Sequence, residues 1–189
     1  MIVTLAVRVL QLVFAVIVLA LSIVLIRGMG PAFFGETASK APSLIDYGAF
    51  CGGAGIAIAI VGVVAAFLEP LQGIIIIALD GLASFFLLAG GIAFAATIKV
   101  GDCGDTSNNG YLGQHAKTFE PSDVKNYGYT RDDKSLGKWE KDFINDTSSR
   151  CRMIQAETAF IWFMFAGFLA TTALSFMNRS RGGGRATMV

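Results

Sequence analysis

The sequence predicts an all-α membrane protein, an antiparallel bundle of four transmembrane helices, from three observations. Residues of the set AVILMFWYC make up 54% of the 189-residue chain and charged residues only 15%, whereas soluble domains carry about 25% charged residues. Four stretches offer the ~20 apolar residues that cross the ~30 Å hydrocarbon core of a bilayer. The net charge of +1 leaves no electrostatic surface for binding nucleic acid.

The four membrane-spanning helices are expected at residues 2–26, 48–68, 71–98 and 154–177. The first apolar run is 25 residues long and begins directly after Met1. A signal peptide has an apolar core of only 7–15 residues, so we expect this run to remain as the first helix. Residues 1–178 are therefore expected to form one membrane domain.

The connections between the helices are very unequal in length. Glu69 and Pro70 alone separate the second helix from the third, which predicts a tight antiparallel turn. Proline suits the start of the third helix because its missing N–H would be unpaired there. Residues 27–47 and 99–153 form two longer loops on one side of the membrane, and both termini lie on the other. The short basic tail, residues 179–189, carries Arg179, Arg181 and Arg185.

Two cysteines bracket the second long loop and decide the orientation. Cys103 follows the third helix and Cys151 precedes the fourth, so packed helix ends could bring them within disulfide range. Asn145 begins an N-glycosylation sequon in the same loop. Both features require the oxidising, extracellular side, while the distribution of Lys and Arg is indecisive. We expect cytoplasmic termini; two free thiols and an unused sequon are the alternatives.

A row of small residues runs along one face of the second helix. They recur at steps of three and four residues: Gly48, Gly52, Gly55, Ala59, Gly62 and Ala66. Helices in lipid associate through close backbone approach, which small residues permit. The row predicts close packing, within the bundle or between protomers. General enrichment of Gly and Ala in membrane helices is the alternative explanation.

Charged residues within the spans point to polar contacts inside the bundle. Arg8 lies ~9 Å and Asp80 ~14 Å from the same side at 1.5 Å per residue, and charges at such depth usually face a partner. We expect the two to approach each other, as a structural tie or as a headgroup or proton site. Other polar residues at similar depth are Gln11, Thr171 and Ser175. Glu157 is expected to meet Lys99 at the opposite side.

No sequence motif for catalysis is evident. The single histidine, His115, falls in the polar loop, and neither a catalytic triad nor a metal or phosphate motif accompanies it. Cys51 is best explained as a small buried apolar residue. We therefore do not expect an enzyme, and expect neither a metal nor a cofactor.

Several segments together resemble the fungal non-classical export protein family, four-helix proteins of the MARVEL superfamily. The similar segments are residues 67–71 with the Glu-Pro turn, the third helix with Asp80, Gly101-Asp102-Cys103, and residues 150–156. The resemblance covers roughly residues 67–103 and 150–178, and more loosely the first helix. Claudin-like tetraspans are the nearest structural alternative, and they place a cysteine pair in the first extracellular loop. Residues 27–47 contain no cysteine, which disfavours this alternative.

The resemblance implies a plasma-membrane protein of furrow-like fungal domains called eisosomes. It implies a role in sphingolipid-responsive membrane organisation, membrane curvature and unconventional secretion. Expected partners are membrane lipids such as sphingolipid or sterol, further copies of the chain, and eisosome scaffold proteins. The long loop between Cys103 and Cys151 departs from the family pattern, as does the short tail, so loop functions are not carried over.

Two functions therefore compete on sequence grounds. The first is a non-enzymatic membrane organiser that self-associates and interacts with lipid. The second is a small transporter or channel that uses the intramembrane residues Arg8, Gln11 and Asp80. Four helices per chain leave little room for a pore, so transport would require an oligomer.

Overall fold

The computed structural model describes all residues except 1, 29–42, 68–73, 108–109, 120–132 and 183–189. The helices of this described part are α1 (Ile2–Arg27), α2 (Ser43–Phe67), α3 (Ile74–Ile98), α4 (Tyr111–Gln114), α5 (Ala116–Phe119) and α6 (Asp133–Gly182). Some side chains at helix ends also lie outside the description, including that of Ala66 and those of the basic tail.

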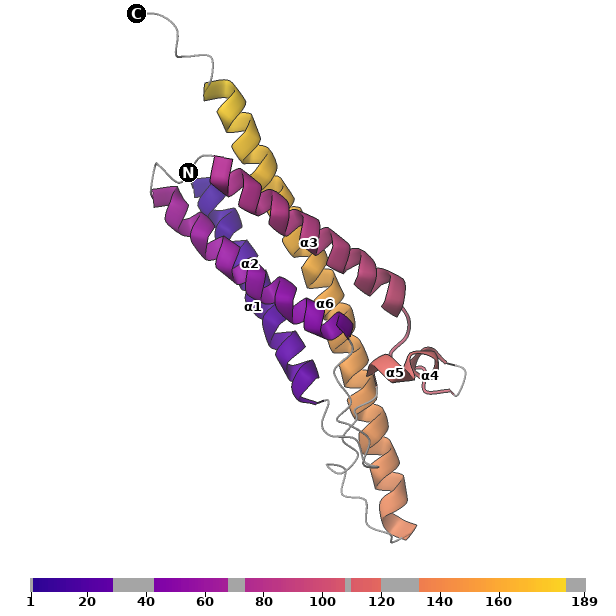
Figure 1. The fold of residues 1–189 in the computed structure, drawn as a ribbon. Helices are drawn as coiled ribbons and strands as arrows, with labels where there is room; N and C mark the ends of the chain where they lie inside the picture. Colours follow the sequence, from indigo (N-terminus) through magenta and orange to yellow (C-terminus); the bar gives the residue numbers. More distant parts are fainter. Residues whose placement is uncertain (1, 29–42, 68–73, 108–109, 120–132, 183–189) are drawn as a thin grey trace, which may run out of the picture.

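Four of these helices, α1, α2, α3 and α6, are long and apolar enough to cross a membrane. Each is antiparallel to its neighbours, with α1 packed between α2 and α6, and α3 packed on α6 and more loosely on α2. Figure 1 shows the start of α1 and the last turns of α6 at one end of the bundle, here called the terminal end. The opposite end, where α4 and α5 lie, is called the loop end. The predicted four-helix fold is confirmed.

Helix α6 differs most from the sequence prediction. It begins at Asp133 rather than near residue 154 and runs for 50 residues, ~75 Å at 1.5 Å per residue, so its first turns extend beyond the bundle (Figure 1). Hydropathy identifies only the apolar part of a helix, and these turns are polar. Within them, Arg150 Nε donates to Asp146 Oδ2 at 2.9 Å, one helical turn away.

The start of α2 differs from the sequence prediction by a few residues. Helix α2 begins at Ser43, five residues before the predicted Gly48, and α3 is described from Ile74 onward, so its expected start at Leu71 lies outside the described residues. The expected turn at Glu69 and Pro70 lies outside the described residues. At the loop end, α3 stops where Lys99 adopts a left-handed conformation with φ 48°, and its N–H donates to the Ala95 carbonyl, a common way to end a helix.

A covalent link and a small cap join α3 to α6 at the loop end. Cys103 and Cys151 form a disulfide with a Cα–Cα distance of 5.8 Å, which confirms the predicted pairing. The Tyr111 hydroxyl donates to the Ile98 carbonyl at the end of α3, and Gln155 Nε2 donates to the Gly101 carbonyl. The buried Phe119 ring packs on Tyr111. The chain that follows α3 is thus held to α6 by the disulfide and by the hydrogen bond from Gln155.

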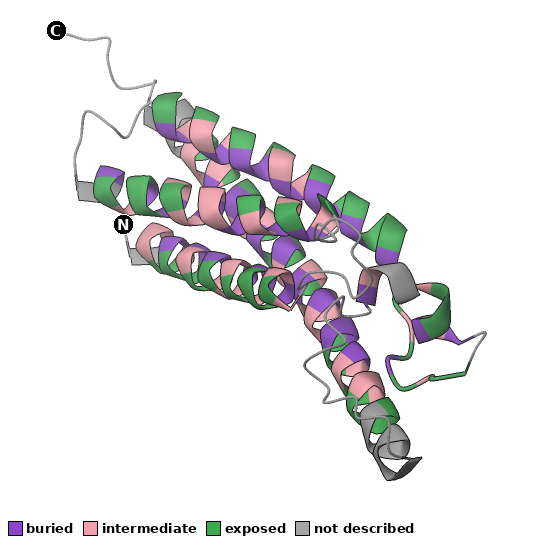
Figure 2. Ribbon diagram, turned by 60° about the horizontal axis from the view of Figure 1, so that its bottom comes forward, coloured by how far each residue is buried: buried purple, intermediate pink, exposed green. Residues whose placement is uncertain are grey.

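The core runs along the axis of the bundle, and the opposite faces of the helices remain exposed (Figure 2). The described small residues of the α2 row are all buried: Gly48, Gly52, Gly55, Ala59 and Gly62. A Cβ added to Gly52 would lie 2.7 Å from the backbone N of Leu19, so α1 and α2 approach each other at this point. The row therefore faces the bundle interior, as close packing requires.

Candidate functional site: two polar layers inside the bundle

An ion pair lies inside the bundle near the terminal end. Arg8 of α1 donates through Nη1 and Nη2 to the two carboxylate oxygens of Asp80 on α3, each at 2.6 Å. The exposed fractions are 2% for Arg8 and 0% for Asp80. A fork of two parallel hydrogen bonds is the strongest geometry available to an Arg–carboxylate pair. The structure thus brings together the two charges that the sequence singled out.

Gln11 extends this ion pair to the fourth helix. Its Oε1 accepts from Arg8 Nη1 at 3.2 Å, and its Nε2 donates to Thr171 Oγ1 of α6 at 3.1 Å. Gln11 and Thr171 are almost completely buried, at 1% and 0% exposed. The network joins three helices, while α2 contributes a gap for the guanidinium, because a Cβ on Gly62 would lie 2.5 Å from Arg8 Cζ. We call Arg8, Gly62, Asp80 and Thr171 the terminal layer.

The charged groups of Arg8 and Asp80 meet at one depth, because Nη1 and Nη2 of the guanidinium donate to the carboxylate oxygens at 2.6 Å. The depths of ~9 Å and ~14 Å expected from the sequence differ by ~5 Å, a distance that an Arg side chain can cover.

A second polar cluster lies near the loop end. The Ser22 hydroxyl of α1 donates to Glu157 Oε1 of α6 at 2.5 Å. The Glu157 side chain is completely buried, and its carboxyl lies where a Cβ on Gly48 would stand. Phe94 of α3, also completely buried, closes the same site. We call Ser22, Gly48, Phe94 and Glu157 the loop layer.

The expected contact between Glu157 and Lys99 is wrong. Lys99 is exposed beyond the last turn of α3, whereas the Glu157 carboxyl points into the bundle toward Ser22. Among the described residues, Glu157 forms no salt bridge, and its Oε2 has no hydrogen-bond partner. The sequence places Ser22 on the same side of α1 as Arg8 but does not show that it meets Glu157.

The two layers repeat at a fixed interval on all four helices. The residues of the loop layer stand fourteen positions from those of the terminal layer on α1, α2, α3 and α6, ~21 Å along each axis. Halfway between them, seven positions from each, lie the buried residues Ala15, Gly55, Leu87 and Met164. A seven-residue repeat is typical of helices that pack at a shallow left-handed angle.

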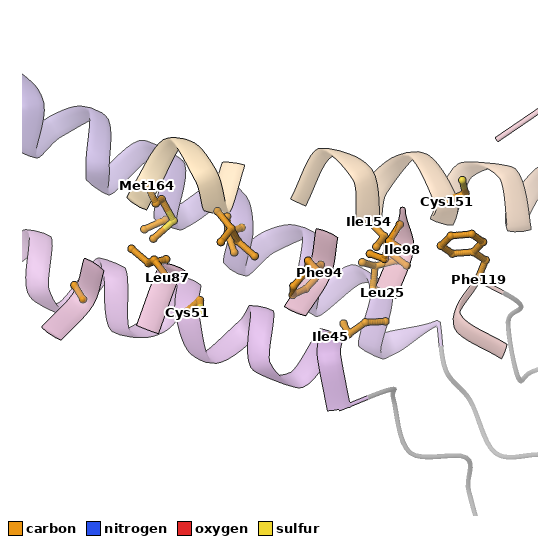
Figure 3. Close-up of a cluster of buried hydrophobic side chains, with 14 of the residues drawn as sticks. Leu25, Ile45, Cys51, Leu87, Phe94, Ile98, Phe119, Cys151, Ile154 and Met164 are labelled. Atoms are coloured by element: carbon orange, nitrogen blue, oxygen red, sulfur yellow. The ribbon is translucent and has the colours of Figure 1, made fainter. Parts of the chain in front are cut away.

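The middle layer is apolar and tightly filled. A Cβ on Gly55 would overlap Met164 Cε and would lie 3.2 Å from the Ala15 Cβ. Figure 3 shows Met164 and Leu87 pointing toward each other, with Phe94, Leu25, Ile98 and Ile154 continuing the core toward the loop end. The polar layers are therefore separated by packed apolar side chains.

The remaining predicted residues lie apart from these layers. Asn145 is exposed on the polar part of α6, inside a helix rather than in a loop, and its glycosylation stays a prediction. Cys51 is a free, buried cysteine. No group of three or more His, Cys, Asp or Glu side chains in the described part of the chain could hold a metal ion.

Residues 2–174, nearly the whole chain, match the MARVEL membrane-associating domain. The protein belongs to the MARVEL family. Comparisons with curated proteins and with solved structures give no match. The four-helix MARVEL bundle accounts for the two polar layers as interior features, because each helix contributes one residue to every layer. Family membership establishes membrane association, and the roles of individual residues rest on the geometry above.

Proposed function

We propose that this MARVEL protein is a non-enzymatic organiser of the plasma membrane that self-associates and interacts with lipids. Its main support is that the two opposite charges of the terminal layer, Arg8 and Asp80, compensate each other inside the bundle. Arg8 and Asp80 bind each other in two hydrogen bonds and are almost completely buried. Because each charge is the other's partner, the pair links α1 to α3 and needs no bound ion or lipid headgroup to compensate it.

The finer part of the proposal rests on the resemblance to the fungal non-classical export family. On that basis the protein acts in eisosome-type furrows, with both termini in the cytoplasm and eisosome scaffold proteins among its partners. Its organising role would respond to sphingolipid or sterol content and would contribute to membrane curvature and unconventional secretion. The disulfide between Cys103 and Cys151 supports the orientation, since such bonds persist on the extracellular side.

The exposed surface of the bundle supports lateral association with lipid or with further copies. Large apolar side chains remain exposed on all four spans, among them Val13, Val64, Phe85 and Phe163. In a bilayer these faces contact acyl chains or neighbouring helices. Self-association would leave the polar layers intact because they lie on the opposite, interior faces.

One observation favours transport as a second candidate. Arg8 Nε and Glu157 Oε2 are buried without a partner among the described residues, as groups on an ion or proton path would be. The apolar middle layer of Ala15, Gly55, Leu87 and Met164 separates the two. Transport through one chain would have to open this layer.

Reconstitution of the purified full chain in liposomes distinguishes the two functions. The organiser predicts clustering on the membrane by fluorescence imaging and no tracer or proton flux above protein-free liposomes. The transporter predicts flux above that of protein-free liposomes, which disappears in Asp80→Asn under conditions where this variant remains folded. In cells, the organiser further predicts furrow-like plasma-membrane patches; a uniform distribution would contradict the eisosome part alone.

A further inference from the structure

A groove of about 650 Å³ opens between the loop-end halves of α2 and α3. Its lining residues are Ser43, Leu44 and Tyr47 of α2, Ala89, Ala93 and Thr97 of α3, and Thr118 of α5. This volume falls within the ~300–1,000 Å³ range of small-molecule sites. We propose that the groove binds a sterol, with its hydroxyl at the loop end and its rings along the alanines of α3.

The groove is polar at one end and apolar along its length. Ser43 opens α2, Thr97 lies in the last turn of α3, and Thr118 comes from the cap above them. These three hydroxyls therefore lie where the membrane segments end, at the level of the lipid headgroups. Deeper in the groove the α3 wall consists of Ala89 and Ala93. This arrangement matches a lipid with one small polar end.

The charge of the lining indicates which polar group fits. Among the described residues, none of the seven lining side chains is charged, whereas a phosphate group is usually held by Arg or Lys. Hydroxyl groups donate and accept hydrogen bonds with one another, so the lining suits an alcohol. The chemistry therefore favours a sterol hydroxyl over a phospholipid headgroup.

The shape of the groove favours a compact and rigid body. From Ala89 to Thr97 the α3 wall covers eight residues, ~12 Å, which is within one leaflet of the bilayer. The Tyr47 hydroxyl donates to the Phe86 carbonyl at 3.1 Å, and its ring lies against Gly90, where a Cβ would stand 2.9 Å from Tyr47 Cε1. These contacts hold the α2 and α3 walls of the groove together before any ligand binds. A rigid ring system loses less conformational freedom in such a site than an acyl chain does.

Sterol binding in this groove would be a structural basis for the lipid interaction in the proposed function. The inference rests on the lipid interaction and not on self-association. Binding is measured on the purified full chain in nanodiscs of neutral phospholipid, with a photoactivatable, alkyne-tagged sterol as the probe. The expected result is crosslinking to peptides of α2 and α3 that excess unlabelled sterol abolishes. The assay needs no clustering, so failure of the organiser function would leave its result unaffected.

Matched variants test the location of the site. Ala93→Trp fills the groove and should reduce crosslinking about tenfold. Ala95→Trp places the same bulk at an exposed position about 160° around α3 from Ala93, outside the lining, and should leave crosslinking unchanged. Retention of the wild-type melting temperature and of the Cys103–Cys151 disulfide shows that each variant is folded.

A second variant tests the hydroxyl contacts without adding bulk. Ser43→Ala combined with Thr97→Val removes two hydroxyls and should weaken sterol binding about three- to tenfold, the effect of one lost hydrogen bond. Wild-type crosslinking in both Ala93→Trp and this double variant would overturn the proposal. Equal displacement of the probe by added phospholipid would overturn it as well, since the groove would then be a general lipid contact.

Discussion

The terminal layer and the loop layer occupy equivalent positions in the bundle but satisfy their buried carboxyl groups differently. At the terminal end both Asp80 oxygens accept from Arg8, and Gln11 joins the network to Thr171. At the loop end Glu157 accepts a single hydrogen bond, from Ser22. Its second oxygen has no partner among the described residues.

This difference shows that a heptad position does not by itself determine how a buried acid is stabilised. In the described residues, the helices of the terminal layer are linked by hydrogen bonds and an ion pair, and no disulfide lies near them. The loop layer lies six residues from the disulfide at Cys151 on α6, so the cap holds α3 and α6 in place around it. A layer whose helices are fixed by other means can tolerate an incompletely paired carboxyl.

Removal of the disulfide should produce the largest effect. Cys103 and Cys151 are separated by 48 residues, and closing a loop of that size stabilises the folded chain by ~4 kcal/mol in the chain-entropy model. We expect Cys103→Ser/Cys151→Ser to lose about this much, measured by thermal unfolding in detergent. The loop end should loosen first, with faster hydrogen exchange around Glu157 than around Asp80. Uniform loosening of both ends would contradict the idea that the disulfide supports the loop layer.

Breaking the ion pair should have the next largest effect. Asp80→Asn leaves Arg8 as a buried, uncompensated charge, which typically costs ~3 kcal/mol or more. We expect a corresponding loss of thermal stability in detergent. Adding Arg8→Gln should restore at least ~1 kcal/mol, because the double variant no longer buries an unpaired charge. Strictly additive losses would show that Arg8 and Asp80 are not energetically coupled.

The sequence predicted the terminal layer better than the loop layer for a physical reason. Opposite charges at similar depth attract, so Arg8 and Asp80 could be paired from hydropathy and helical rise alone. The partner of Glu157 is a neutral hydroxyl, and the search for a cation led to Lys99 instead. Only the register of α1 against α6 shows that Ser22 faces Glu157, and register is a tertiary property.

The same reasoning explains which parts of the fold could be predicted. Apolar runs identified the four spans, and small residues identified the interior face of α2. The polar first turns of α6 carry no hydropathy signal, although they continue the helix to Asp133. The groove between α2 and α3 also escaped prediction, because it depends on how loosely two helices pack.

Glycine-to-alanine substitutions should have different effects on stability on the two faces of α2, the interior face with Gly62 and the neighbouring face with Gly53. A Cβ on Gly62 would lie 2.5 Å from Arg8 Nε, whereas a Cβ on Gly53 would meet nothing within 4 Å. We expect Gly62→Ala to lose ~2 kcal/mol, because the Arg8 guanidinium can move aside only by giving up its hydrogen bonds to Asp80. Gly53→Ala is the matched control and should be neutral or more stable by up to ~1 kcal/mol. Equal unfolding temperatures for the two variants would mean that the row does not carry the packing.

The smallest effect is expected for Glu157→Gln, the counterpart of Asp80→Asn in the loop layer. Glutamine has nearly the same shape, and its Oε1 can still accept from the Ser22 hydroxyl. No cation among the described residues pairs with the Glu157 carboxyl, so the substitution leaves no opposite charge uncompensated. We therefore expect a change within ~1 kcal/mol in the free energy of unfolding, against ~3 kcal/mol for Asp80→Asn. Thermal unfolding of the two variants side by side measures the contrast. A loss at Glu157 as large as that at Asp80 would mean that its carboxylate is paired with a charge outside the described residues, and the two layers would then be stabilised in the same way.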